Sequence, residues 1–159
     1  MFSSESGLSK LLLRTPSRPT AIAIFVCMRI SANIKSAYNQ HDAVVQTNDS
    51  AKEMNIAVKS TGFGSSVNGG ELLMLSLATC FCNDIYREAA KRNMEVTGVE
   101  VEVMGEFGAE GEPGFNFQYK ANVTANAPDE EIADLIAHTD KAAEIHNTLR
   151  KGIAVTLTK

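Results

Sequence analysis

The sequence lacks the features that mark nucleic-acid-binding, membrane-spanning and disulfide-stapled proteins. It has no run of Lys and Arg, and its net charge is −4, so no basic surface is available to neutralise phosphates or anionic lipids. No stretch approaches the roughly 20 apolar residues needed to cross a bilayer. The chain has only three cysteines, and three cannot all pair within one chain. We therefore expect a cytoplasmic protein with neither nucleic acid nor a membrane as a partner.

Common cofactor motifs are also missing. The glycine-rich stretch TGFGSSVNGG (residues 61–70) lacks the Lys-Ser/Thr ending of a P-loop, and its glycine spacing does not match a dinucleotide fingerprint. His41, His138 and His146 show no metal-ligand spacing among themselves or with the cysteines. We expect no cofactor and no metal, and we expect His146 to be a partly exposed residue at a helix end.

The chain of 159 residues fits one domain. Residues 1–27 differ in composition from the rest, with five Ser, three basic residues and two of the four prolines. This N-terminal extension is interpreted as a transit-type leader, an early start before Met28, or an extra ordered element. We place the domain itself at residues 28–159.

Apolar periodicity and turn-forming residues predict an α+β fold. Loop 61–70 contains Asn68, and Glu71 three residues later is typical of a helix start. Two strands show clear alternation, and the loop between them has hairpin length. The predicted elements are, in order, strands 30–38, 43–48 and 54–60, helix 71–93, strands 96–107 and 115–125, a helix from about Pro128, a short helix ending near Leu149, and a last strand 153–158.

The helix predicted over residues 71–93 changes character along its length. Its first half is apolar almost all round, which predicts burial on every side. Its second half is charged and amphipathic, and we expect it to reach solvent. The charged residues there are spaced for i,i+3 and i,i+4 ion pairs on a solvated face; they are Asp84, Arg87, Glu88 and Arg92.

Cys80 and Cys82 lie two positions apart in this helix. Free cysteines usually behave as small buried hydrophobes, so inert packing is one interpretation of the pair. Side chains at i and i+2 of a helix point about 200° apart, so a disulfide between them would require the helix to deform. A reactive thiol needs a nearby cation or a helix N-terminus. No Lys or Arg occurs between Lys59 and Arg87, so a cation must come from another element or another subunit.

Several short motifs together resemble the OsmC/Ohr family of osmotically inducible and organic hydroperoxide resistance proteins. The segment NGGELLMLSLATCFCNDIYREAAKRNMEVTGVEVEVMGEF is similar to the family's central helix and following strand, and NTLRKGIAVTLTK to its closing segment. The resemblance covers about residues 29–159. It implies an OsmC-like fold in which a long buried central helix is wrapped by antiparallel sheets in an intertwined homodimer. It also implies that Cys80 is the cysteine that attacks a peroxide.

The sequence departs from the family pattern at three places. The position of the family's resolving cysteine is Ala143, and the acid that orients the activating arginine falls on Gly70, with Glu71 one place later. The stretch SAYNQHDAVV lacks the usual arginine, for which Lys35, Lys52 or Arg87 of a partner chain could substitute. The resemblance thus implies Cys80, Cys82 and Glu71 as candidate catalytic residues, with Cys82 as a possible resolving thiol.

These observations lead to one favoured function and two alternatives. The favoured function is a homodimeric, thiol-dependent hydroperoxide reductase that uses an organic hydroperoxide as substrate and a thiol as reductant. One alternative is a non-catalytic OsmC-like protein that binds a small hydrophobic ligand. The other is a cysteine redox sensor that controls a partner protein.

Overall fold

A computed structural model describes residues 27–158 of the chain. The described residues form β1 (Ile30–Ala37), β2 (Gln40–Thr47), β3 (Ser50–Met54), α1 (Gly69–Lys91), β4 (Val96–Glu106), β5 (Phe115–Ala125), α2 (Asp129–Ala142) and α3 (Glu144–Lys151). No helix in this part of the chain has both the length and the apolar character required to cross a membrane. The three interpretations of the N-terminal extension concern residues that lie, except for Cys27, outside the described part.

The start of α1 is fixed by a capping box, as the sequence predicts. The side chain of Asn68 accepts a hydrogen bond from the Glu71 backbone N–H at 2.9 Å. The Glu71 carboxylate accepts one from the Asn68 N–H at 2.7 Å. These two bonds satisfy N–H groups that have no partner within the helix.

The N-terminal sheet is an antiparallel meander in the order β1-β2-β3. Its two tight turns contain Asn39 (φ 55°) and Asn48 (φ 50°), and Asn tolerates this left-handed conformation better than most residues. The second turn pairs Thr47 with Ser50, so the third strand starts directly after it. The predicted strand at 54–60 is therefore wrong: β3 occupies Ser50–Met54, and residues 55–60 leave the sheet.

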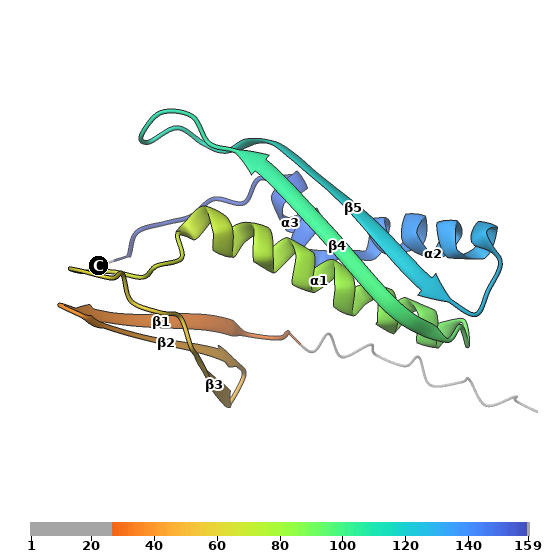
Figure 1. The fold of residues 1–159 in the computed structure, drawn as a ribbon, viewed down its shortest axis with the longest axis horizontal. Helices are drawn as coiled ribbons and strands as arrows, with labels where there is room; N and C mark the ends of the chain where they lie inside the picture. The colour runs from red at the N-terminus through yellow and green to blue at the C-terminus, as the bar shows by residue number, and fades with distance from the viewer. Residues whose placement is uncertain (1–26, 159) are drawn as a thin grey trace, which may run out of the picture.

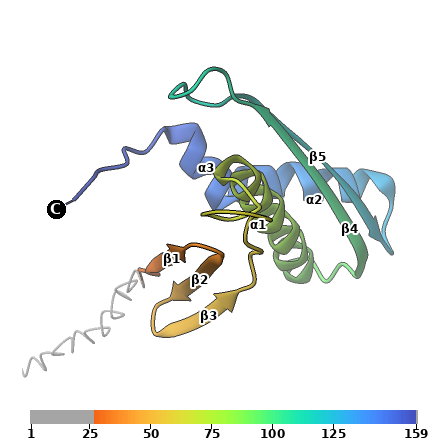
Figure 2. The same cartoon turned by 60° about the vertical axis from the view of Figure 1, so that its left-hand side comes forward.

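The second sheet is the β4-β5 hairpin, which packs across α1 on the side opposite the N-terminal sheet (Figures 1 and 2). Both strands were predicted, and the structure confirms them. α1 contacts β4, α2 and α3, and α2 contacts β5. The core lies between these elements and is made of fully or almost fully buried side chains of α1, α2 and the α2–α3 junction, namely Phe81, Ile85, Ala89, Leu135 and Ala143.

The end of the chain, after α3, differs from the prediction. A strand was expected at 153–158, but these residues form no strand and are exposed. Val155 and Leu157 are 99% and 96% exposed. The alternating pattern is that of a strand, but a strand needs a sheet edge to pair with, and this segment pairs with none of the described strands.

Within this single chain the first half of α1 is not buried on every side, and the second half reaches solvent at Tyr86, Arg87 and Lys91 as expected but also buries two of its charged residues. Leu75, in the apolar first half, is 56% exposed, whereas Asp84 and Glu88 in the charged second half are 3% exposed. The reason is that α2, α3 and the hairpin cover the second half. The first half borders an open apolar groove of about 580 Å³ between α1 and the N-terminal sheet.

Candidate active site

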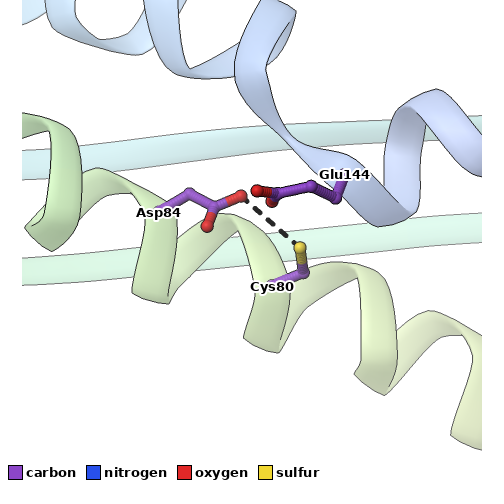
Figure 3. Close-up of side chains that lie close together, drawn as sticks. All are labelled: Cys80, Asp84 and Glu144. Atoms are coloured by element: carbon purple, nitrogen blue, oxygen red, sulfur yellow. Dashed lines mark hydrogen bonds between the residues drawn. The ribbon is translucent and has the colours of Figure 1, made fainter. Parts of the chain in front are cut away.

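Cys80 lies near the middle of α1, half-buried, with its sulfur directed toward α3 (Figure 3). Its thiol donates a hydrogen bond to the Asp84 Oδ2, with 3.4 Å between sulfur and oxygen. The two residues are one helical turn apart, which brings their side chains to the same face. The pair therefore joins a thiol to a proton acceptor within one element.

Asp84 is in turn held by Arg87. Arg87 Nη1 lies 2.8 Å from Asp84 Oδ1 and 3.3 Å from a carboxylate oxygen of Glu144 on α3. The Arg87 Nε also donates to Glu88 at 3.0 Å. One guanidinium thus links α1 to the start of α3 and neutralises the acids beside Cys80. The predicted solvated face is wrong for Asp84 and Glu88, because α2 and α3 cover these carboxylates, while Arg87 pairs with both, Lys91 pairs with Glu88, and His138 Nε2 lies 3.3 Å from Glu88.

The N-terminus of α3 also faces the sulfur. Burial raises the pKa of the Cys80 thiol, the backbone N–H of Ile145 in the first turn of α3 lowers it, and the charges of Asp84 and Glu144 raise it. The pKa of Asp84 is raised by burial, and it is lowered by the hydrogen bond from Cys80 and by Arg87. The net direction for Cys80 is upward, so this chain alone holds Cys80 as a protonated thiol beside a carboxylate.

The other two predicted site residues, Cys82 and Glu71, lie apart from Cys80 and its partners Asp84, Arg87 and Glu144. Cys82 is half-buried and unpaired, and α1 runs without interruption through both cysteines, so their side chains leave the helix on different faces. Glu71 is exposed and caps the helix. It is nine residues from Cys80, about 13.5 Å along the axis. The catalytic roles of Cys82 and Glu71 therefore stay predictions, and no geometry within one chain joins either residue to Cys80.

Cys80 also lines the apolar groove defined above. The groove walls come from the N-terminal sheet and from the first half of α1, and they include Ile34, Val44, Leu72 and Leu75. Apolar walls with a few polar groups are typical of sites for small organic molecules. The arrangement places Cys80 at the edge of a space suited to a small hydrophobic molecule.

The Sγ of Cys80 and carboxylate oxygens of Asp84 and Glu144 lie within 4.8 Å of one another. Sulfur and carboxylate oxygen are metal-ligand atoms. However, Arg87 already forms ion pairs with both carboxylates, and a metal ion would have to displace or oppose that positive charge. The geometry therefore fits an ion-pair network better than a metal centre.

Sequence reasoning missed Asp84 as a partner of Cys80 and misjudged His146. The i,i+4 spacing from Cys80 was the available signal for Asp84. His146 was expected to be partly exposed, which is wrong, because it is 5% exposed. Its ring packs against Phe81 and Tyr119, with centroids 5.5 and 4.6 Å away. α3 folds back onto the hairpin and core, which no local pattern indicates.

Comparison with known proteins places this architecture in a recognised class. The structure resembles an OsmC-like protein of Mycoplasma pneumoniae (18% identity, 77% of this chain and 89% of that chain, TM-score 0.52). It also resembles an organic hydroperoxide resistance protein OsmC of Legionella pneumophila (20% identity, 81% and 94%, TM-score 0.50). A third similar structure is an OsmC-like protein of Vibrio cholerae (12% identity, 76% and 92%, TM-score 0.53). At these identities, the likeness shows the fold.

The family follows from the sequence itself. The family model for OsmC-like proteins matches residues 62–158, which is more than half of the chain. The protein belongs to the OsmC-like family, so the resemblance noted in its motifs is confirmed, as is the α+β OsmC-like fold. A search of curated proteins found no match.

Proposed function

We propose that the protein reduces organic hydroperoxides through Cys80, as part of defence against oxidative stress. The observation that carries the proposal is the hydrogen bond from the Cys80 thiol to Asp84 at the edge of an apolar groove. The family membership and the name of the similar Legionella protein, an organic hydroperoxide resistance protein, support the same chemistry. The groove would hold the hydrocarbon part of the substrate and leave its peroxide near the sulfur.

In the proposed reaction, Cys80 is the nucleophile and Asp84 is the acceptor of its proton. As a hydroperoxide approaches, Asp84 accepts the thiol proton, and the Cys80 sulfur attacks the terminal peroxide oxygen. An S–O bond forms and the O–O bond breaks, so that sulfur is oxidised by two electrons to a sulfenic acid. The departing alkoxide takes up the proton and leaves as an alcohol. A second thiol then attacks the sulfenic sulfur, forming a disulfide and releasing water.

We propose that the second thiol is Cys82, a thiol of the second subunit or a low-molecular-weight thiol. Position 143, where the resemblance implies a resolving cysteine, is Ala. Cys82 of the same chain would need local unwinding of α1 to reach Cys80. A small thiol entering the groove needs no such change.

We propose further that the working unit is a homodimer. Leu75, Ile34 and Val155 are all more than half exposed, on α1, on the N-terminal sheet and on the C-terminal segment respectively. Apolar surface of this extent is typical of an obligate interface. A second copy would cover the first half of α1 and could add a cation near Cys80, which would counter the raised pKa of the thiol. In light scattering, the wild type is expected to have the mass of a dimer and Leu75→Asp that of a monomer; a monomeric wild type would contradict the proposal.

The chemistry is tested by mixing reduced protein with one equivalent of cumene hydroperoxide and following intact mass. We expect the wild type to gain one oxygen or a disulfide within seconds, Cys80→Ser to stay unchanged, and Cys27→Ser, the matched control, to react like the wild type. Loss of the disulfide in Cys82→Ser would identify Cys82 as the resolving thiol. If Cys80→Ser is oxidised as fast as the wild type, Cys80 is not the nucleophile.

One observation favours a second function. The raised pKa of Cys80, caused chiefly by burial, disfavours the thiolate. A protein that holds a small hydrophobic ligand in the same groove without chemistry would need no thiolate. Alkylation with iodoacetamide near neutral pH separates the two functions, since rapid labelling of Cys80 supports the reductase and inertness until denaturation supports ligand binding.

A further inference from the structure

His146 is a titratable residue in surroundings that suit an uncharged one. It lies in α3 and is 5% exposed. Its ring packs against Phe81 of α1, with the centroids 5.5 Å apart, and against Tyr119 of β5, with the centroids 4.6 Å apart. Neither ring nitrogen is open to solvent, and neither has a hydrogen-bond partner among the described residues. The contact between α3 and the core therefore includes an imidazole whose polar atoms are unsatisfied.

Burial at this position costs more for the protonated ring than for the neutral ring. Native proteins normally pair their buried polar groups, so an unpaired one calls for an explanation. A neutral imidazole here leaves one donor and one acceptor without partners. A protonated imidazole would leave two donors without partners and would also bury a positive charge. The docked position of α3 thus selects the neutral form of His146.

The charged groups around the ring offer no free acceptor to an imidazolium. Asp140 of α2 acts on His146, but this carboxylate is already paired with Arg150 of α3 at 2.5 Å and accepts the hydroxyl proton of Tyr119 on β5. α1 meets the imidazole with the uncharged ring of Phe81. Burial lowers the pKa of His146, Arg150 lowers it further, and Asp140 raises it; the net direction is downward.

We propose that His146 is an acid-sensitive latch: α3 docks on the core only while the imidazole is neutral, and protonation of His146 releases the helix. In the released form the ring is in water and has an ordinary pKa of 6.5, whereas in the docked form the pKa is lower. The released form therefore binds the proton more readily, and docking weakens as the pH falls below 6.5. The weakening is complete once the pH is below the pKa of the docked form.

The latch acts on the Cys80 cluster because α3 carries part of it. The Glu144 carboxylate lies within 4.8 Å of the Cys80 sulfur and pairs with Arg87. The backbone N–H of Ile145 acts on the same sulfur. Release of α3 would withdraw both groups and uncover Asp84, so acid would take the cluster apart. Docking of α3 involves no peroxide chemistry, and this proposal and the proposed function can therefore fail separately.

Amide hydrogen exchange followed by mass spectrometry, from about pH 7.5 to about pH 5, measures the docking of α3 in the full chain. The protection of the α3 amides is corrected for the intrinsic pH dependence of exchange. We expect this protection to fall by up to about tenfold per pH unit below 6.5. β4 serves as the internal reference and should keep its protection over the same range.

One variant and one matched control assign the effect to His146. His146→Phe keeps a ring between Phe81 and Tyr119 but cannot be protonated, so the protection of its α3 should no longer depend on pH. His138→Gln removes a histidine whose side chain is 50% exposed, and its α3 should lose protection as the wild type does. Because the chain has three histidines, the ring resonances of His146 can also be followed by NMR in the wild type. They should report a neutral imidazole as long as α3 is protected.

Three results would each overturn the proposal. The first is α3 protection in the wild type that is the same at both ends of the pH range. The second is an equal loss of protection in His146→Phe and the wild type. The third is protonation of His146 at or above pH 6.5 while α3 stays protected, which needs no variant to fold.

Discussion

The two halves of α1 differ in what covers them. The second half carries Asp84, Arg87, Glu88 and Lys91, yet it lies under α2, α3 and the hairpin, and Asp84 and Glu88 are buried within an ion-pair network. The first half carries Leu72, Leu73 and Leu75, yet it borders an open groove. Cys80 lies at the boundary between them. A charged segment can thus be interior when its charges are paired, while an apolar segment of the same helix is exposed in the single chain, where the proposed second subunit would cover it.

The largest difference in stability between the two halves of α1 is expected when one large apolar side chain in each half is truncated to Ala. Phe81→Ala removes a fully buried ring and should lower the free energy of unfolding by about 3–5 kcal/mol. Leu75→Ala removes a side chain that is exposed in the single chain. If a second copy covers it, Leu75→Ala should weaken the dimer, so its stability loss should be largest where the wild type is dimeric and should shrink as dilution dissociates both proteins, whereas the loss in Phe81→Ala should not.

Urea unfolding at several protein concentrations measures both changes. The matched design uses two positions on one helix with similar apolar character. A wild-type stability that does not change with protein concentration, together with a concentration-independent loss in Leu75→Ala, would show that this half of α1 has no partner chain over it.

A smaller effect is expected from removing Arg87, the cation beside Cys80 at the boundary between the two halves of α1. Arg87→Gln removes the positive charge that pairs with Asp84 and Glu144, two carboxylates whose charges raise the pKa of the Cys80 thiol, so the thiol should lose its proton less readily. We expect oxidation of Cys80 by cumene hydroperoxide to slow by about tenfold. Arg92→Gln is the control, because Arg92 pairs with exposed Asp134 at 2.7 Å.

Stopped-flow consumption of the hydroperoxide compares the two variants at one pH. Equal rates in Arg87→Gln and the wild type would remove Arg87 and Asp84 from the proposed proton path. Equal slowing in Arg92→Gln would point to a general loss of helix stability instead.

The smallest effect concerns Glu88, a buried carboxylate in the second half of α1. Lys91, Arg87 and His138 lower the pKa of Glu88 from an ordinary 4.5 to about 2. A lowered folded-state pKa stabilises the protein above the unfolded-state value and loses that contribution as the pH falls through the folded-state value. Stability should therefore decline between pH 4.5 and about 2, and it should decline less steeply in Glu88→Gln.

Thermal unfolding at a series of acidic pH values measures this difference. Subtracting the Glu88→Gln curve from the wild-type curve isolates the contribution of this group from those of other carboxylates. Parallel curves would mean that Glu88 is not selectively stabilised by its three partners.

The sequence predicted correctly the elements whose pattern depends only on residues close together in the chain. The alternation in β4 and β5 and the Asn68–Glu71 capping box each depend on nearby residues, and each is confirmed. β3 was misplaced because SAKEM has no apolar alternation and both of its faces are exposed. Its position follows from the turn at Asn48, which sets the register.

The candidate site was predictable only in part. The motif around Cys80 identified the thiol, but the burial of Asp84, Glu88 and His146 arises from α2 and α3 folding back over α1, which lies far away in sequence. Arg87 was considered as a cation from a partner chain, whereas its observed contacts are with acids of its own chain. Contacts between elements that are distant in the chain produce no periodic pattern in the sequence, so the sequence did not predict them.

The central claim is that Cys80 is the residue that a hydroperoxide oxidises. The most direct measurement is peptide-resolved mass spectrometry of the reduced wild type, quenched with a sulfenic-acid trap seconds after one equivalent of cumene hydroperoxide is added. The account predicts the trapped oxygen adduct on the peptide that contains Cys80, with Cys27 unmodified. An adduct confined to Cys27 or Cys82, or no adduct within minutes, would contradict it.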